Sequence, residues 1–471
     1  MRLPILPLVS LLALVLLLPG RAGEPPALTN APAWLTQPLS LADCLNLAFQ
    51  QNGAVLRSRQ DLEASHGLSV QTRAILIPKV QASGEYGIVE DSAVDSLQVG
   101  SISGFPAGIP VISPGTEHWA AGLRLVQSVF EGGRMLSSVR TARLIKEQAL
   151  AGHDTVLADT ATEVRIAYYE VLRARQEIEV AEASIELLQR ELVDNERRFN
   201  AGTVPRFNVL RAEVELANAR PRLSQARNAH RIAKNVLVNR LGFRVPKEIW
   251  EDIPLTLTDG LDLPRLEIEV PQAVAQALDR RPELVALRTA ERLRQEGVVG
   301  ARAGALPRVQ GYAGYGARKS NFSPFLEDEV HGWEAGVQAS WNVFDGALTR
   351  GKVIEARALL SRAEIETDDV IRQIELEVRS SCSTLVEAWE VLQSQLKVQE
   401  QADEALRLAR ARSEAGTGTQ LDVLGAQTAL TDARTTQVRA KFAYAIARTR
   451  LERAIGAYLP EPARPSPGSN R

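Results

Sequence analysis

Residues 119–132 read WAAGLRLVQSVFEG, and residues 333–346 read WEAGVQASWNVFDG. The likeness continues as far as Gly242 in the first copy and Gly456 in the second, always 214 residues apart. Upstream, the copies match at an offset of 229 residues, so a loop before Trp119 is longer by 15 residues in the first copy. Solenoid and propeller repeats are much shorter than this unit. We therefore expect one large supersecondary unit that has been duplicated.

The quoted stretches alternate between apolar and polar residues, as β-strands do. One face of the second stretch is apolar and carries Trp333, Ala335, Val337, Ala339, Trp341 and Val343. Residues 79–89, 119–130 and 308–316 follow the same pattern. Roughly ten alternating residues with aromatic ends, paired into hairpins, are typical of a membrane β-barrel with lipid outside and a polar lumen inside. A half-buried hairpin of a soluble sheet alternates identically, but four such strands in an otherwise helical chain favour the barrel.

Very long helices are predicted beside these strands. Each unit reads as helix, strand, loop, strand, very long helix, tight turn and returning helix. The pattern is helical over residues 133–199, about 100 Å at 1.5 Å per residue. A heptad seam runs from Val164 to Phe199, so this helix should lie along another helix in a coiled coil. Returning helices are expected over residues 206–241 and 420–455, with a local kink at Pro221.

The chain begins with a segment that predicts export. Residues 1–22 combine an early Arg2, an apolar run and a small-residue cleavage site, as a signal peptide does. An uncleaved N-terminal membrane anchor is the alternative. The expected organisation of the rest is a first unit, a partly structured connector, a second unit and a disordered tail, over residues 23–242, 243–270, 271–457 and 458–471.

The sequence contains no convincing catalytic or cofactor constellation. It lacks a nucleophile elbow, a phosphate-cradling glycine loop and a zinc-binding helix, and its five histidines are scattered without ligand spacing. We therefore expect neither an enzyme nor a cofactor. The net charge of −2 and the absence of a basic stripe give no reason to expect nucleic-acid binding. Cys44 and Cys382 are expected to be buried thiols, although a single disulfide bridge is possible.

The order of these motifs resembles the TolC-type outer-membrane efflux factor family. The resemblance covers residues 39–456 and rests on the duplicated order, the Phe-Glu-Gly and Phe-Asp-Gly strand ends, and the Ala-Gly-Thr turns. It implies a mainly α fold with a transmembrane β-barrel, in which a homotrimer forms a twelve-stranded barrel and an α-helical periplasmic tunnel. It also implies a passive exit duct in the outer membrane, surrounded by outer-membrane lipid and served by a periplasmic adaptor and an inner-membrane pump.

Two sets of site residues follow from this resemblance. The turns containing Gly202, Thr203, Gly416 and Thr417 are candidates for the tip that meets the adaptor, although the glycines could be plain helix stops. Asp422 and its first-copy equivalent, Asn208, are candidates for a tunnel gate. The family typically has a second acidic residue three positions after the first, where this chain has Gly425, and the first-copy counterpart is Arg211. Asp422 could instead simply favour a helix N-terminus.

A protein from another class would share much of this pattern. An exported coiled-coil protein could act as a periplasmic spacer or adaptor without forming a pore. An adaptor should also carry a compact β-rich module of short strands and glycine turns. This chain shows only the four alternating strands. The channel is therefore the favoured interpretation.

Overall fold

The computed structural model describes most of the chain. The described residues are 37–90, 97–98, 110–112, 116–244, 252–320 and 325–457. The predicted signal peptide (residues 1–22) and the predicted tail (residues 458–471) lie outside them. None of the helices in the described part of the chain combines the length and apolarity that a membrane crossing requires.

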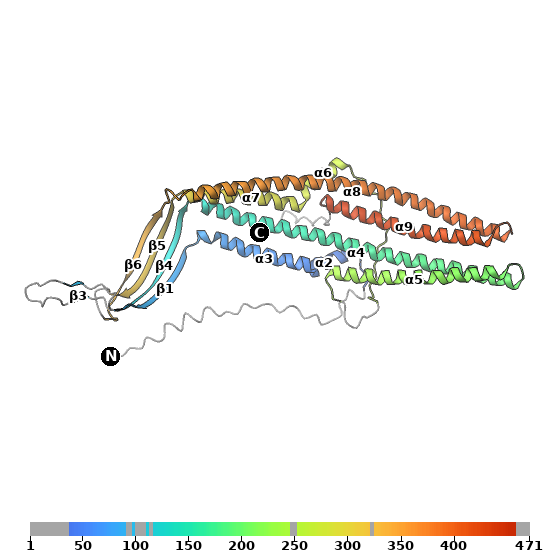
Figure 1. Cartoon of the computed structure of the whole chain (residues 1–471), viewed down its shortest axis with the longest axis horizontal. Coiled ribbons are helices and arrows are strands. Elements are labelled where there is room, and N and C mark those ends of the chain that lie inside the picture. Colours follow the sequence, from blue (N-terminus) through green and yellow to red (C-terminus); the bar gives the residue numbers. More distant parts are fainter. Residues whose placement is uncertain are drawn as a thin grey trace, which may run out of the picture.

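The two units have the same order of elements, and they give a long, narrow molecule with a sheet at one end (Figure 1). The first unit contains α2 (Leu41–Gln51), α3 (Gly53–Arg73), η2 (Ala74–Leu76), β1 (Lys79–Ile88), β2 (Leu97–Gln98), β3 (Pro110–Ile112), β4 (Glu117–Glu131), α4 (Arg134–Asn200) and α5 (Arg206–Leu241). The second unit contains α6 (Val270–Arg280), α7 (Pro282–Arg302), η4 (Ala303–Ala305), β5 (Arg308–Lys319), β6 (Glu329–Ser340), α8 (Leu348–Glu414) and α9 (Gln420–Ala454).

The predicted long helices are confirmed. Helices α4 and α8 have 67 residues each, and each returns through a short turn into α5 or α9. The seam on α4 is buried from Val164 to Ala174, where α5 and α9 pack against it. Phe199, the last residue of the predicted seam, is exposed, because the hairpin ends there. Helix α5 continues through Pro221, and the kink expected at that residue stays a prediction.

The single opening helix expected in each unit is wrong, because each unit opens with two helices. In the first unit Asn52 is extended, with φ −61° and ψ 130°. Its Oδ1 accepts a hydrogen bond from the backbone N–H of Ala54 at 2.7 Å, which caps α3. In the second unit Arg281 is extended because it precedes Pro282, whose ring disfavours the helical conformation of the residue before it.

The four long strands form one antiparallel sheet in the order β1-β4-β5-β6. Strands β1 and β4 form one hairpin and β5 and β6 the other, so the β4–β5 pairing joins the two units. The connection between β1 and β4 is longer than that between β5 and β6, as the different offsets predict. Strand β6 does not reach Phe344 as expected. It ends at Ser340, opposite Arg308, because the residue before Arg308 is Pro307, which has no N–H to pair.

The main core lies midway along the helices. It gathers apolar side chains of α2, α4, α5 and the connector, including Cys44, Tyr168, Leu172, Leu237 and Leu257. The connector is more tightly held than its proline-rich sequence suggests. The hydroxyl of Tyr168 donates to Asp259 Oδ2 at 2.8 Å, and the hydroxyl of Tyr444 in α9 donates to the Pro264 carbonyl at 3.0 Å. Cys44 and Cys382 are both buried and free, as expected.

Candidate functional site

One face of the sheet is apolar and lacks protein cover. The strand register aligns Ala82, Leu123, Tyr315 and Trp333 in one row across the four strands. Trp333 is 80% exposed and Val337 on the same face of β6 is 73% exposed. A soluble sheet would bury such a face against a second layer, and no described element supplies one. In the part of the chain that the structure describes, this apolar face is therefore uncovered.

The opposite face of the sheet carries polar and charged side chains that contact one another across strands. Arg124 of β4 lies over the ring of Tyr312 of β5, 4.6 Å from its centre. Arg124 Nε also lies 4.0 Å from Glu334 Oε1 of β6. Near the far end of the sheet, His118 Nε2 lies 3.7 Å from Glu85 Oε1. These partly exposed pairs are typical of a wet surface.

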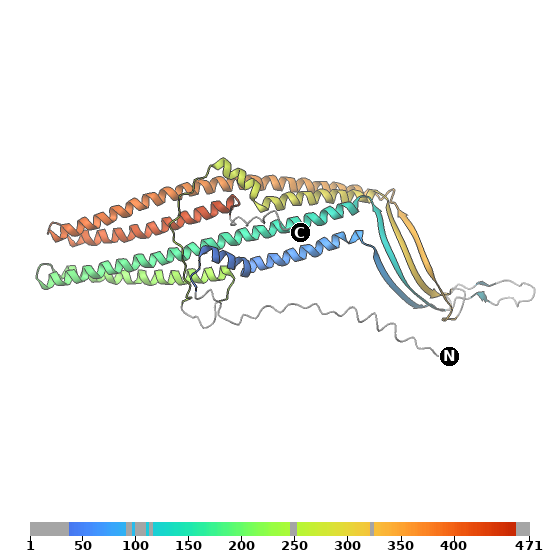
Figure 2. The same cartoon turned by 180° about the vertical axis from the view of Figure 1, so that it is seen from behind.

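The two helix turns lie together at the end of the molecule that is farthest from the sheet (Figure 2). Gly202 and Gly416 have φ values of 76° and 75°, in the left-handed region that closes a helix. In each turn the threonine N–H and hydroxyl both donate to the same carbonyl: Thr203 to Arg198 and Thr417 to Arg412. A Cβ added at either glycine would meet nothing within 4 Å. The turns are thus exposed and closed by hydrogen bonds.

Asp422 lies in the first turn of α9, just after the second of these turns. Its carboxylate accepts hydrogen bonds from the N–H of Thr419 at 2.9 Å and from the Thr419 hydroxyl at 2.7 Å. The Asp422 N–H donates back to the Thr419 hydroxyl oxygen at 3.3 Å, which completes a capping box. These bonds, the backbone one first, lower the pKa of Asp422 below its ordinary value. The carboxylate is therefore ionised at neutral pH and stabilises the start of α9.

Asn208 lies in the corresponding first turn of α5, but it is not equivalent in its contacts. Pro205 occupies the N-cap position of α5 and offers no side-chain hydrogen bond. In the part of the chain that the structure describes, no hydrogen bond links the side chains of Asn208 and Asp422. The structure thus places both candidates at the same end of the molecule without a hydrogen bond between their side chains. Gly425 lies exposed in the next turn of α9.

The two helical hairpins meet along a polar seam that the sequence reasoning missed. Glu191 of α4 accepts a hydrogen bond from Gln420 of α9 at 2.5 Å and another from Gln427 at 3.3 Å. Farther from the turns, the Thr431 hydroxyl donates to Ser184 Oγ at 3.1 Å, and Arg439 Nε lies 3.4 Å from Glu177 Oε1. The sequence did contain a signal for this polar seam. Glu177, Ser184 and Glu191 follow one another at intervals of seven residues, so they share one face of α4.

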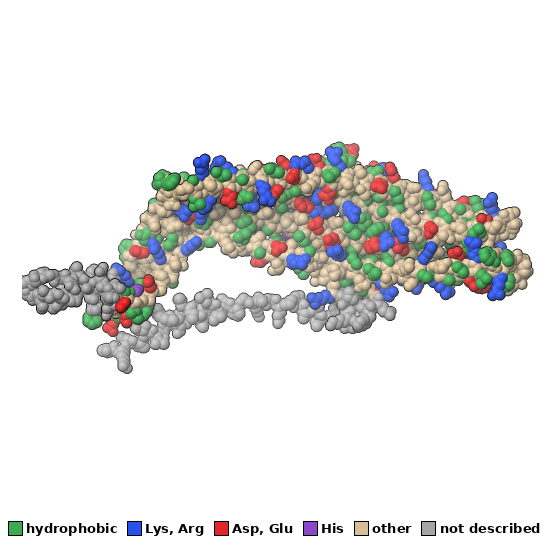
Figure 3. Space-filling view, in the orientation of Figure 1, with side chains coloured by type: hydrophobic (Ala, Val, Ile, Leu, Met, Phe, Trp, Pro, Cys, Tyr) green, Lys and Arg blue, Asp and Glu red, His purple; other side chains and the backbone are tan. Residues whose placement is uncertain are grey.

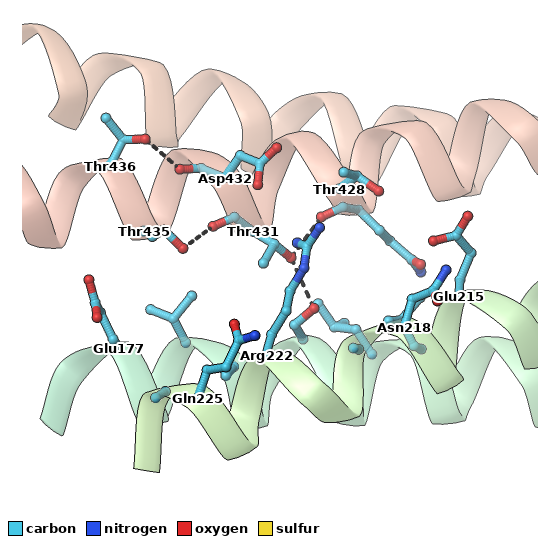
Figure 4. A pocket seen from close by; sticks show the side chains of 18 of the residues that line it. Glu177, Glu215, Asn218, Arg222, Gln225, Thr428, Thr431, Asp432, Thr435 and Thr436 are labelled. Carbon is cyan, nitrogen blue, oxygen red and sulfur yellow. Dashed lines mark hydrogen bonds between the residues drawn. The ribbon is translucent and has the colours of Figure 1, made fainter. Parts of the chain in front are cut away.

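A groove of about 660 Å³ lies beside this seam, between α4, α5 and α9 (Figure 4). Its walls combine polar and apolar side chains, and Arg222 reaches across it from α5 toward α9. The hydroxyls of Thr435 and Thr436 donate to carbonyls of their own helix, so they are already satisfied. In the described ranges of the chain, no three His, Cys, Asp or Glu side chains gather as metal ligands would. The groove is an open surface of a helix bundle.

The two thiols are poor candidates for chemistry. Burial raises the pKa of the Cys44 thiol to about 12, so it stays protonated at neutral pH. Burial also raises the pKa of Cys382. Since the thiolate is the reactive form, neither cysteine is set up as a nucleophile.

Known proteins share this sequence pattern and this fold. A family model described as outer membrane efflux protein matches residues 44–242 and 273–457. The alkaline protease secretion protein AprF of Pseudomonas aeruginosa is 25% identical over 429 residues, covering 88% of this chain and 83% of AprF. The outer membrane protein TolC of Escherichia coli is 23% identical over 439 residues, covering 89% of this chain and 83% of TolC. The outer membrane protein VceC of Vibrio cholerae, a crystal structure, matches with a TM-score of 0.70 and 18% identity over 88% of this chain and 96% of VceC.

Proposed function

The chain belongs to the outer membrane efflux protein family, and we propose that it is the exit duct of a tripartite efflux or type I secretion system. It lies in the outer membrane, with its helical part in the periplasm. The duct conducts substrates passively and catalyses no reaction. A periplasmic adaptor and an inner-membrane pump supply the energy and select the substrate. The observation that carries the proposal is the uncovered apolar face of the sheet, attached to two 67-residue helices.

We propose that the working form is a homotrimer. Among the strands that the structure describes, β1 and β6 each pair with one neighbour, so the sheet of a single chain has two open edges. An unpaired backbone group in lipid costs several kcal/mol, and only a closed barrel removes such edges. Three copies supply twelve strands, an even number within the range of known barrels.

The helices offer a matching surface for neighbouring copies. Ile354, Ile365 and Leu376 of α8 are strongly exposed, and they are spaced by 11 residues. Eleven residues complete three turns at 3.67 residues per turn, so these side chains stay on one face of a nearly straight helix. Such a face suits helices that pack side by side around a tunnel.

The proposal includes the processing and division of the chain. Residues 1–22 are removed on export, residues 23–242 and 271–457 form the two units, residues 243–270 connect them, and residues 458–471 form a tail. The two separate segments matched by the family model support this division. The turns at Gly202–Thr203 and Gly416–Thr417 then meet the adaptor, because they are exposed at the end opposite the sheet.

The rival function, a periplasmic spacer without a pore, predicts a different behaviour on gels. An outer-membrane fraction that contains a folded barrel should show a band whose migration changes on heating, because the barrel resists detergent until it is boiled. A soluble spacer should give one band at the same position before and after heating. A heat-insensitive, soluble protein would contradict the proposed duct.

Asp422 is proposed as a gate residue in addition to its role as a helix cap. Three symmetry-related carboxylates at the tunnel entrance would create a negative field for passing ions. We expect Asp422→Asn to reduce the cation preference and the block by multivalent cations of single trimers in planar bilayers. The capping contribution has its own pH signature. Because the folded pKa is lowered, the contribution is present at neutral pH and is lost only as the pH falls below the ordinary range of an aspartate.

Asp43 provides a matched control for this substitution. It completes the same capping box with Ser40 at the start of α2, and its pKa is also lowered, chiefly by hydrogen bonding to Ser40. Asp43→Asn should weaken a cap in the same way while leaving ion selectivity untouched. If Asp422→Asn changes thermal stability but neither cation preference nor multivalent block, Asp422 is a cap alone.

A further inference from the structure

Four helix–strand junctions meet where the sheet joins the helices, and each carries arginine. Arg73 ends α3, Arg134 begins α4, Arg302 ends α7, and Arg350 lies in the first turn of α8. The helices α3, α4, α7 and α8 pack side by side in that order. Their ends therefore lie together at the end of the strands that joins the helices (Figure 1). We call residues 73–79, 131–134, 302–308 and 341–352 the junction collar.

The junction collar is strongly basic, and the opposite end of the sheet is acidic. The collar contains seven Lys or Arg residues and two acidic ones, Glu131 and Asp345. At the other end, the described residues 85–90, 116–120, 317–320 and 325–331 contain six acidic residues and two basic ones. The sheet therefore carries opposite charge at its two ends, so a membrane that it spans meets different fields at its two surfaces.

Helix stability does not account for this basic collar. Arginines at the C-terminal ends of α3 and α7 favour the helix dipole, but Arg134 and Arg350 lie at N-terminal ends, where a positive charge opposes it. Arg134 Nε lies 3.5 Å from Glu131 Oε2. Within the described ranges, Arg73, Arg302 and Arg350 have no ion-pair partner. Three of the four arginines thus leave their charge available to a partner outside the chain.

Apolar side chains accompany these charges. Ile77, Trp341 and Phe344 are exposed, and Phe344 reaches 88% exposure. The Trp341 ring is fixed in place because its Nε1 donates to the Ala305 carbonyl at 3.1 Å. Apolar and basic side chains lie next to one another where the sheet meets the helices (Figure 3). Aromatic rings combined with long cationic side chains are typical of the level at which a membrane surface meets water.

We propose that the junction collar binds anionic phospholipid headgroups of the periplasmic membrane surface. The apolar side chains contact the acyl chains, and Arg73, Arg134, Arg302 and Arg350 bind the phosphate groups. Charge complementarity favours an anionic phospholipid, because each Lys or Arg near an anionic surface strengthens binding about fivefold. The inference rests on the proposed function, since it requires the sheet to span the membrane. It adds a lipid class that the duct prefers.

Quenching of tryptophan fluorescence by brominated lipid tests this proposal. The purified full-length assembly is reconstituted in mixtures of phosphatidylcholine and phosphatidylglycerol, with bromine on one lipid or the other. The signal of Trp341 is taken as the difference from a Trp341→Phe variant. We expect phosphatidylglycerol to bind beside Trp341 more than about tenfold better than phosphatidylcholine at low salt. This preference should shrink at high salt. Equal quenching by the two lipids would overturn the proposal.

Matched variants test whether the arginines of the junction collar cause the lipid preference. Replacing all four arginines of the collar by glutamine should remove most of the preference. Replacing four exposed arginines elsewhere on the helices, Arg220, Arg231, Arg379 and Arg450, changes the net charge equally and should leave it intact. An unchanged preference in the collar variant, or loss of the preference on adding inorganic phosphate at constant ionic strength, would contradict lipid binding by the collar. If the collar variant does not fold, the comparison of quenching by the two brominated lipids in the wild-type protein still tests the proposal.

The same experiment separates this inference from the proposed function. A protein that does not insert gives no quenching by either brominated lipid, which contradicts the membrane duct itself. A protein that inserts and is quenched equally by both lipids contradicts only the collar.

Discussion

Gly416→Trp should abolish export while leaving the assembly intact in the outer membrane. A Cβ added at Gly416 would meet no atom of the chain within 4 Å, so the exposed turn leaves room for a tryptophan to begin. The added side chain would block the surface that the adaptor must approach without displacing the chain's own packing. The left-handed backbone at φ 75° adds a local cost of about 1–2 kcal/mol. The long helical hairpin of α8 and α9 should tolerate this cost. Export of a substrate and the amount of heat-modifiable assembly are measured on the same cells.

Two control variants separate docking from backbone strain. Gly416→Asn tolerates the same left-handed conformation with a small side chain, so export should be retained. Gly346→Trp places the same ring at a glycine with φ 65° and equally open surroundings, but at the opposite end of α8. It should also retain export. If Gly416→Trp prevents assembly, or if it exports normally, the turn is not the adaptor-docking tip.

Val337→Arg should strongly reduce the amount of folded protein in the outer membrane, whereas Gln338→Arg should not. The two residues are neighbours in β6, but Val337 lies on the apolar face and Gln338 on the polar face. An arginine facing lipid near the middle of a membrane barrel costs about 2–4 kcal/mol, while an arginine facing a wet lumen is tolerated. Heat-modifiable assembly in purified outer membranes measures the difference.

This pair of variants is informative because each residue controls for the other. If the sheet of this chain stood in water, its apolar face would be open to solvent, because Val337 is 73% exposed. An arginine in place of Val337 would then cost little folding free energy. Equal amounts of folded Val337→Arg and Gln338→Arg protein would therefore place the apolar face in water. That result would contradict the assignment of the sheet to the membrane.

Much of this fold could be predicted because its signals are local and periodic. The first long helix was predicted over residues 133–199, within one residue of α4 at each end, since no proline interrupts it and a glycine closes it. The strand pairing within each unit followed from the alternation of apolar and polar residues along two consecutive strands. The duplication then implied that both helical turns and both hairpins lie at matching ends of the molecule.

The parts that sequence reasoning missed depend on contacts between distant segments. The end of β6 at Ser340 is set by Pro307, which directly precedes the neighbouring strand β5, and alternation along β6 does not reveal this. The burial of the connector depends on Tyr168 and Tyr444, which come from helices far along the chain. The break at Arg281–Pro282 had a local signal that was overlooked, because a proline disfavours the helical conformation of the preceding residue.

The candidate site was predicted less completely than the fold. The turns around Gly202 and Gly416 have the expected left-handed glycines and exposure. Asp422 does cap α9, while its role as a gate stays a prediction. The polar seam of Glu191, Gln420 and Gln427 joins two units that no single helical pattern relates. Pairing of α4 with α9 is a property of the folded chain, so only the structure brings these residues together.

The mass of the assembly extracted from the outer membrane in mild detergent tests the central claim most directly. The sheet of one chain has two open edges, at β1 and β6, and twelve strands from three chains are proposed to close them. We therefore expect a particle of three chains, after subtraction of bound detergent, that conducts ions when added to a planar bilayer. A stable single chain inserted in the outer membrane would contradict the account.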